Sequence, residues 1–433
     1  MKFACFSVEG TALSWWKRLV DEGNEVLVYI ESKHGPTKVG DGIVPKTGNY
    51  AEWVKWGQGG IYFFDCTGQG VRADLLRRAG EKVVGGSKFC DKLESDRNWS
   101  SQLVEDIGIR VPEYKSFNTI GATRNFLKSN KKDWVFKSNK YIDASATYMA
   151  HNTQDMEKYL EYLQSKHGDN VSNILQEKLD GFALSTARWW NGNSWAGPYE
   201  STLEHKKLMD GDIGPATGCS LNMITFYKSD TPSIAKALKF EELGEKFRNE
   251  QASPGLYDIN ALLSEDDGEP YFLEFTPRLG FDSEPTSQKG IKDLGKLLSD
   301  LAGGLDVNDL FDRSKVYCSV RLSVEPYPWE SVTAHDKVTC LDTPVMNQDG
   351  LWSGDFIAYG LRFDKKKGLV VADPFGLVGL ASGTGDNARR AFEGAYKMLE
   401  GDFQVPNLQY RTDAIKMIED DIKTILSLGY EVR

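Results

Sequence analysis

Two stretches carry the interpretation of this chain: residues 204–220, EHKKLMDGDIGPATGCS, and residues 272–285, FLEFTPRLGFDSEP. The first combines lysines, aspartates, glycines and a proline, a mixture typical of a loop and not of a regular element. The backbone N–H groups of such a loop are available to a ligand. We therefore predict an anion-handling loop over residues 204–220.

The second stretch begins in an apolar strand, residues 271–275, whose acidic residue is Glu274. A carboxylate among apolar neighbours is unfavourable unless a cation lies against it. The preceding strand-like segment, residues 255–263, contains Asp258. The two segments predict a hairpin in which Asp258 and Glu274 lie across from each other and share a cation, although the residues alone leave open that Asp258 is solvated.

Composition limits the class of protein. The chain has 433 residues, a formal charge of −11 and 40% hydrophobic residues, which indicates a soluble globular protein of about two to four domains. There is no apolar run of about 18 residues and no leader-like start, so we expect a cytoplasmic protein without a membrane partner. The acidic balance argues against nucleic-acid binding. We expect small-molecule substrates and a monomer or homodimer.

The N-terminal region predicts a parallel sheet. Short apolar strands over residues 2–7, 25–30, 61–64 and 82–84 alternate with helical patterns, which indicates an α/β fold whose strand ends face ligands. Residues 7–11, SVEGT, follow the first strand, but one glycine beside an acid makes a poor phosphate cradle. Further along, the patterns predict a hairpin over residues 183–195, one helix over 233–250 and one strand over 356–363.

Six segments in a fixed order carry a resemblance to a known family. They are GGSKFCDKLESDRNWSSQLVEDIGIRVPEY, WVFK, ILQEKLDG, EHKKLMDGDIGPATG, FLEFTPRLGFDSEP and the tail GLVGLASGTGDNARRAFEGAYKMLEGDF. In this order they resemble the glycinamide ribonucleotide synthetase family, the phosphoribosylamine–glycine ligases of purine biosynthesis, which are ATP-grasp enzymes. The resemblance covers nearly the whole chain.

The resemblance implies an ATP-grasp fold in four parts. These are an N-terminal parallel α/β domain (1–97), a linker with the lid subdomain (98–190), a catalytic subdomain (191–320) and a small C-terminal mixed α/β domain (321–433). ATP lies between the lid and the catalytic subdomain in this family. The implied cofactors are therefore ATP and Mg²⁺, with Mn²⁺ as an alternative.

The resemblance also assigns roles to individual residues. Arg97 and Lys137 stand at phosphate-binding positions, although Lys137 taken alone also fits a surface lysine at the end of a strand. The remaining assignments are a hinge around adenine (Glu177, Lys178 and Leu179), metal ligands (Glu274, with Asp258 and Thr276), residues that hold the activated carboxylate (Asp212, Thr217 and Gly218) and the signature after the metal strand (Arg278 and Asp282). Catalytic roles fall to Lys137, Asp212 and Arg278.

The chain also departs from the family pattern. SVEGT replaces the family's GGREH, Thr276 replaces the asparagine of Glu-Phe-Asn, and residues 141–145 replace a glycine loop of the lid. These changes leave three interpretations open. The protein is an amide-forming ligase for a small carboxylate such as glycine with an altered amine acceptor, the purine-pathway enzyme itself, or an inactive nucleotide-binding protein.

Overall fold

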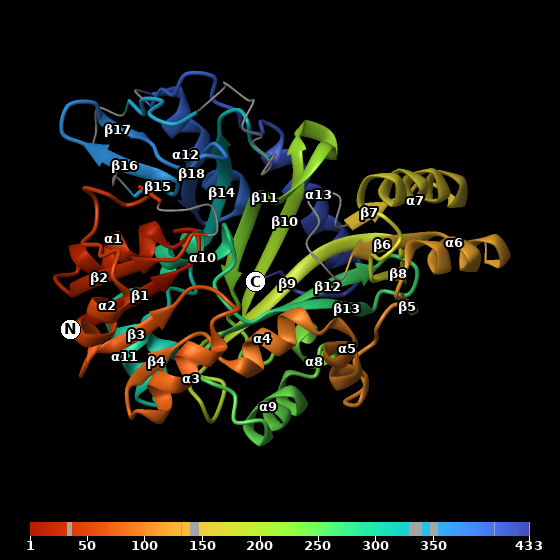
Figure 1. Cartoon of the computed structure of the whole chain (residues 1–433), viewed down its shortest axis with the longest axis horizontal. Helices are drawn as coiled ribbons and strands as arrows, with labels where there is room; N and C mark the ends of the chain where they lie inside the picture. Colours follow the sequence, from red (N-terminus) through yellow and green to blue (C-terminus); the bar gives the residue numbers. More distant parts are fainter. Residues whose placement is uncertain are drawn as a thin grey trace.

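The computed structural model describes residues 1–32, 37–130, 132–138, 147–328, 340–346, 354–401 and 403–432. It has the predicted mixed α/β architecture, with a parallel sheet at the N-terminus and a large antiparallel sheet in the body of the molecule (Figure 1). The predicted replacement for the lid glycine loop, residues 141–145, lies outside the described residues. No helix in the described ranges is long and apolar enough to cross a membrane.

The N-terminal layer is a parallel sheet in the order β2-β1-β3-β4. Its strands match the apolar runs of the sequence: β1 and β3 are buried on both faces, whereas β2, at the edge of the sheet, is buried on one face and half-buried on the other. The strands end at one edge, where the loops after β1, β2 and β3 meet. The elements of this layer are β1 (Lys2–Ser7), α1 (Leu13–Asp21), β2 (Glu25–Ile30), α2 (Tyr50–Gly57), β3 (Ile61–Phe64), α3 (Gly70–Arg78) and β4 (Lys82–Val84).

The segment expected to form the lid, which we continue to call the lid, has a separate small sheet with its own hydrophobic core and projects to the right in Figure 1. The strand order is β5-β8-β6-β7, with two helices packed on the sheet. The two helices α4 and α5 lead into the lid from the N-terminal layer. These elements are α4 (Lys88–Ser95), α5 (Arg97–Glu105), β5 (Tyr114–Phe117), α6 (Ile120–Ser129), β6 (Trp134–Ser138), β7 (Thr147–Met149), α7 (Thr153–His167) and β8 (Asn173–Glu177).

The large sheet has the order β13-β12-β9-β10-β11-β14-β18-β15, and all its paired neighbours are antiparallel. It runs without a break from β13 into the C-terminal part, because β14 pairs with both β11 and β18. Its strands are β9 (Gly181–Trp190), β10 (Glu200–Met209), β11 (Ile213–Phe226), β12 (Gly255–Ser264), β13 (Pro270–Thr276), β14 (Val316–Ser323), β15 (Phe356–Ala358) and β18 (Leu377–Gly385).

The remaining elements cover this sheet or cap its ends. They are the helices α8 (Ser233–Ala237), α9 (Phe240–Asn249), α10 (Ser283–Ser287), α11 (Leu294–Ala302), α12 (Ala388–Glu400) and α13 (Ala414–Ser427), the strands β16 (Leu361–Asp364) and β17 (Gly368–Val371), and the short 3₁₀ turns Asp210–Asp212, Gln288–Gly290 and Asn308–Leu310.

The prediction of an irregular loop over residues 204–220 is wrong. The segment is a β-hairpin, in which β10 and β11 pair from Glu200 and Phe226 to Met209 and Ile213. Its turn-forming residues are concentrated at the tip, where Gly211 (φ 71°) and Asp212 (φ 55°) adopt left-handed backbone conformations. Because the flanking residues pair across the hairpin, most of their N–H groups are used by the sheet and do not form a ligand cradle.

Three smaller predictions also need correction. The helix expected over 233–250 is divided into α8 and α9, because Lys239 adopts a left-handed conformation between them. The strand expected over 356–363 is divided into β15 and β16, which belong to different sheets. In the hairpin expected over 183–195, only an isolated bridge joins Trp190 and Trp195, and β9 instead pairs along its length with β12.

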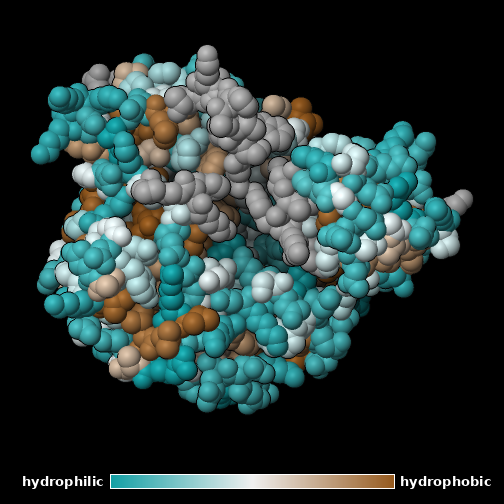
Figure 2. Space-filling view, viewed as in Figure 1, coloured by the Kyte–Doolittle hydropathy of each residue, from teal (hydrophilic) through white to brown (hydrophobic). Residues whose placement is uncertain are grey.

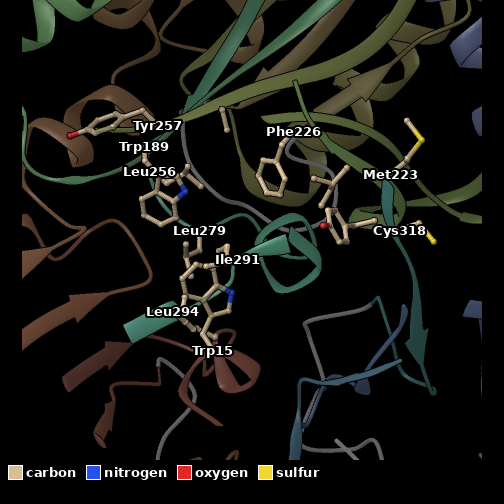
Figure 3. Close-up of a cluster of buried hydrophobic side chains, with 14 of the residues drawn as sticks. Trp15, Trp189, Met223, Phe226, Leu256, Tyr257, Leu279, Ile291, Leu294 and Cys318 are labelled. Carbon is tan, nitrogen blue, oxygen red and sulfur yellow. The ribbon is translucent and has the colours of Figure 1, made fainter. Parts of the chain in front are cut away.

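A hydrophobic cluster joins the N-terminal layer to the large sheet (Figure 3). Trp15 of α1 lies 6.2 Å from Trp189 of β9 between ring centroids. The Trp15 indole N–H also donates to the Glu284 carbonyl at 3.0 Å. Burial of aromatic rings on this scale contributes about 2 kcal/mol or more per side chain, so the cluster fixes α1 of the N-terminal layer against β9 and α10.

Candidate active site

A cavity of about 190 Å³, which we call the inner cavity, lies over the middle of the large sheet. It is bounded by the hairpin β10–β11, by β12 and β13, and by the loop after β13. Figure 2 shows a hollow with hydrophilic surface between the lid and the N-terminal layer. The lining includes Ser185, Thr202, Glu204, Lys206, Thr217, Gly218, Asp258, Asn260, Glu274, Thr276, Arg278, Phe281 and Asp282.

Glu274 of β13 is the centre of a group of cations. Asp96 caps α5 by accepting from the Trp99 amide at 3.1 Å, which starts the helix at Arg97. Arg97 then lies 3.2 Å from Glu274, between Nη2 and Oε2. Burial by itself raises the pKa of Glu274, but Arg97, Lys206, Lys137 and Arg278 outweigh it and lower the pKa below its ordinary value. The carboxylate is therefore ionised, and 37% of its side chain is exposed.

Lys137 of β6 approaches the same carboxylate from the lid. Desolvation lowers its pKa to about 8, and the neighbouring charges of Arg97 and Lys206 act in the same direction against the opposing effect of Glu274. A lysine in this state gains most from an additional anion. The structure thus places Lys137 in the cation group and not at the surface.

Lys206, to which no sequence motif assigned a role, completes the group. Its Nζ lies 2.9 Å from Glu204 Oε1. Glu204 raises the pKa of Lys206 more than burial lowers it, so the ammonium stays charged. Glu204 and Lys206 lie two residues apart on β10 and point to one face, whereas Lys207 points to the other. Recognition of the strand would have revealed this alternation.

The hairpin β12–β13 forms as predicted, but its register differs from the expected one. Asp258 lies opposite Thr276, and Glu274 lies opposite Asn260, with a bulge between Asn260 and Ala261. Asp258 and Glu274 are therefore diagonal neighbours rather than a facing pair. The Asn260 amide donates to Thr276 Oγ1 at 2.9 Å and to Asp258 Oδ2 at 3.3 Å, so it links the two residues.

This corner fits a divalent cation. Oδ1 of Asp258 is buried and accepts no hydrogen bond within the described residues. Burial, followed by the charges of Glu284 and Glu204, raises the pKa of Asp258 well above its ordinary value, which a cation would reverse. No group of three or more His, Cys, Asp or Glu side chains suited to a metal occurs in the described ranges. Mg²⁺ does not need one, because it uses one or two carboxylates together with water and substrate phosphates.

A second cavity of about 480 Å³, which we call the strand-end cavity, lies where β1, β2 and β3 end. Its lining includes Ser7, Glu9, Glu31, Asp65, Cys66, Arg278 and Phe281. Arg278 and Phe281 also line the inner cavity, so the two cavities meet at these side chains. The Arg278 guanidinium lies 5.2 Å from the Phe281 ring centroid.

Comparison with known proteins relates part of the chain to a family. Residues 95–284 match the family model of the phosphoribosylglycinamide synthetase ATP-grasp (A) domain. A phosphoribosylamine–glycine ligase of Neisseria meningitidis serogroup B is 25% identical over 353 residues, 78% of this chain and 79% of the relative. That of Helicobacter pylori J99 is 27% identical over 270 residues, 60% of this chain and 61% of the relative.

Solved structures give the same fold. The phosphoribosylamine–glycine ligase of Thermotoga maritima superposes with a TM-score of 0.71 at 19% identity, covering 95% of this chain and all of the other. The biotin carboxylase domain of Hydrogenobacter thermophilus 2-oxoglutarate carboxylase, solved with MgADP and bicarbonate, has a TM-score of 0.65 at 11% identity, with 100% and 96% coverage. The chain therefore has the ATP-grasp fold, and residues 95–284 are similar to the phosphoribosylglycinamide synthetase ATP-grasp domain.

Three residues that the resemblance assigns to substrate binding line the inner cavity. Each of them already has a contact within the protein. The Thr217 hydroxyl donates to the Lys206 carbonyl at 2.8 Å. Gly218 lies against Phe281, whose ring a Cβ would approach to 3.2 Å. Asp282 is buried and accepts from Arg321 Nε at 2.9 Å.

Asp212 is not brought to either of the two cavities. It lies at the tip of the hairpin β10–β11, where it accepts from Arg411 and lies 2.7 Å from His205 Nδ1. Arg411 also donates to Asp413 at 2.9 Å. The structure thus places Asp212 in a link between the hairpin and the start of α13. The strand pairing extends the hairpin past the cavity, which separates Asp212 from Thr217.

The hinge residues lie where β8 ends. The amide of Glu177 donates to the Glu113 carbonyl at 2.7 Å, and that of Lys178 donates to the Asp133 carbonyl at 3.0 Å. The Glu177 carboxylate lies 3.1 Å from Lys132. These contacts hold the hinge within the lid, and the predicted reading of adenine by Glu177, Lys178 and Leu179 remains a prediction.

Proposed function

We propose that this protein is an ATP-dependent ligase that joins a small carboxylate, such as glycine, to an amine that differs from the family's phosphoribosylamine. The reaction would proceed through an acyl phosphate and release ADP and phosphate. The observation that carries this proposal is the junction at Arg278 and Phe281, where a cation-rich cavity meets a second cavity. Such an arrangement suits two half-reactions on neighbouring substrates.

The cation group suits transfer of a phosphoryl group to an anion. Both partners of that transfer are negatively charged, and fixed positive charges stabilise the transition state. Arg97 and Lys137 would bind the nucleotide phosphates, and Lys206 would face the carboxylate substrate. ATP would lie between the lid and the large sheet, with its adenine near residues 177–179.

Glu274 and Thr276, supported by Asn260 and Asp258, would hold Mg²⁺ or Mn²⁺. Such an ion would neutralise charge on the nucleotide phosphates. The structure of the biotin carboxylase domain from Hydrogenobacter thermophilus contains MgADP, which supports this cofactor pair for a protein of the same fold.

The inner cavity also limits the size of the carboxylate substrate. Its volume of about 190 Å³ suits a small acid. Thr217 and Gly218 would border the acyl phosphate on one side and Arg278 on the other. The amine would then approach from the strand-end cavity past Phe281, which shields the inner cavity from the larger one. Exclusion of water protects an acyl phosphate from hydrolysis.

Hydroxylamine trapping tests this proposal without knowledge of the amine. Incubation with ATP, Mg²⁺, glycine and hydroxylamine should yield glycine hydroxamate together with ADP. Lys206→Met should reduce hydroxamate formation about 100-fold or more, whereas Lys207→Met, on the opposite face of the strand, should retain it. If Lys206→Met forms hydroxamate as fast as the unmodified protein, the role assigned to Lys206 is rejected. If the protein binds ATP but releases no ADP with any small carboxylate, an inactive nucleotide-binding protein is favoured.

One observation favours a second candidate, the purine-pathway enzyme itself. The similarity to the phosphoribosylamine–glycine ligase of Neisseria meningitidis extends over 78% of this chain and 79% of the relative. Formation of glycinamide ribonucleotide from glycine and phosphoribosylamine, at a rate above that with other amines, would establish this candidate.

A further inference from the structure

The lining of the strand-end cavity is acidic. Glu9 follows β1, Glu31 follows β2 and Asp65 follows β3, so one carboxylate comes from the end of each strand. Among the described residues that line this cavity, Arg278 is the only one with a positive charge. Because Glu31 is paired with Arg72, binding of a cationic ligand would depend mainly on Asp65.

Asp65 shows most directly what kind of ligand would fit. Its side chain lines the cavity but the residue is only 2% exposed. Neither carboxylate oxygen accepts a hydrogen bond of normal geometry from any part of the chain that the structure describes. Burial raises its pKa to about 6, against the smaller lowering effects of the Ser7 and Cys66 side chains, the Ala12 backbone and the charge of Arg278. A buried carboxylate in this state is stabilised by a cation that enters the cavity.

Three backbone amides at the loops beside this cavity are already engaged. The amides of Gly68 and Gly70, in the loop after β3, donate to the two oxygens of Asp91 at 2.6 and 2.8 Å. The amide of Gly10, in the loop after β1, donates to the Ser7 hydroxyl at 2.9 Å. Asp91 thus occupies the position that an anionic ligand would take at the loop after β3.

The arginines nearby are also engaged. Arg278 donates to Glu94 from Nε at 3.1 Å and from Nη2 at 2.8 Å, and to the Leu279 carbonyl from Nη1 at 3.0 Å. Arg72 donates to both oxygens of Glu31, at 2.7 and 2.9 Å. A phosphate in the cavity would have to displace these carboxylates and would then lie beside Asp65.

From this arrangement we infer that the strand-end cavity binds an unphosphorylated amine in its protonated form, with the ammonium group on Asp65 and Glu9. As the acceptor of the proposed ligase, and therefore resting on that proposal, this amine would lose one proton to Asp65 before attack. Its nitrogen then forms the C–N bond as the C–O bond to phosphate breaks, and the second proton leaves with the phosphate. An amide, ADP and phosphate are the products.

A matched pair of amines tests the inference. Ethanolamine and O-phosphoethanolamine carry the same amino group and differ by one phosphate. Saturation-transfer NMR measures their binding to the full chain, and ADP release with ATP, Mg²⁺ and glycine measures their use. Ethanolamine should bind at least about tenfold more tightly than O-phosphoethanolamine, because the phosphate would lie beside the carboxylates of the cavity. Equal or tighter binding of O-phosphoethanolamine or phosphoribosylamine would overturn the inference.

Variants separate this inference from the proposed function. Asp65→Asn should weaken ethanolamine binding about tenfold or more and raise the KM for ethanolamine in ADP release. The exposed Asp106→Asn serves as a control that should change neither. If Asp65→Asn does not fold, Glu9→Gln gives the same comparison. If the folded Asp65 or Glu9 variant binds ethanolamine as well as the unmodified protein does, the inference is overturned. If the unmodified protein forms no hydroxamate, only the proposed ligase activity is overturned.

Discussion

The lowered pKa of Lys137 predicts a pH dependence of nucleotide binding. Desolvation reduces this pKa to about 8 from the ordinary 10.5 in the nucleotide-free protein. Phosphate oxygens favour the protonated form, so nucleotide binding raises the pKa again and takes up a proton. At about pH 9 only about a tenth of the free protein carries the proton on Lys137. Affinity should therefore fall about tenfold between about pH 7 and about pH 9, equivalent to about 1.4 kcal/mol.

Isothermal titration calorimetry with a non-hydrolysable ATP analogue and excess Mg²⁺ measures this slope. Repetition in two buffers of different ionisation enthalpy gives the number of protons taken up. Lys137→Arg keeps its charge over this range, so it should bind with little change in affinity and no proton uptake at this site. Lys132→Arg, also in the lid, should retain the slope of the unmodified protein, because Glu113 and Glu177 raise the pKa of Lys132.

Titration of the nucleotide itself is common to all three proteins, so the decisive quantity is the difference between the unmodified protein and Lys137→Arg. The same slope in both would refute the assignment of Lys137 to the phosphates. A steeper slope in Lys137→Arg would also refute it, since arginine cannot lose its proton in this range.

Three further predictions concern the site and its support. Glu274→Gln should lower ADP release about 100-fold or more, with thermal unfolding little changed; a kcat close to that of the unmodified protein would exclude a metal or phosphate-ordering role. Arg321→Met should lower the free energy of unfolding in urea by about 3–5 kcal/mol, because it leaves Asp282 buried without its partner. Adding Asp282→Asn should restore most of this loss. A double variant as unstable as the single one would contradict this. Burial lowers the pKa of His205, but Asp421 and Asp212 outweigh burial and raise it. The stabilising contribution of His205 is therefore complete below its ordinary pKa of 6.5 and should disappear as pH rises through the higher folded-state value; a His205→Gln protein with the same pH profile of unfolding would argue against it.

The structure also explains why the sequence missed part of the site. Residues 204–220 have loop-like composition, yet their glycines and aspartates are needed only at the tip around Gly211 and along a strand with irregular pairing. Composition averages over a window and cannot show this. Once the segment is read as a loop, the alternation that places Lys206 beside Glu204 has no meaning, so the lysine receives no role.

Register is a second property that local patterns do not contain. The sequence predicted the hairpin of β12 and β13 and both of its acidic residues. The bulge after Asn260 changes the pairing, so that Asp258 faces Thr276. A bulge depends on packing against neighbouring strands, and β12 pairs with β9 on its other side.

By itself, the sequence determined the elements and the kind of chemistry. The strands of the N-terminal layer, the hairpin of β12 and β13 and the order of motifs follow from apolar periodicity, turn residues and neighbouring side chains, all of which act within a few residues. Tertiary structure alone decided which charges meet. Glu274 lies near Arg97 from α5, Lys137 from the lid and Lys206 from β10, while Asp212 is held away from them by Arg411, which is 199 residues distant. Such meetings depend on how separate layers pack, because electrostatic energy follows distance in space and not separation along the chain.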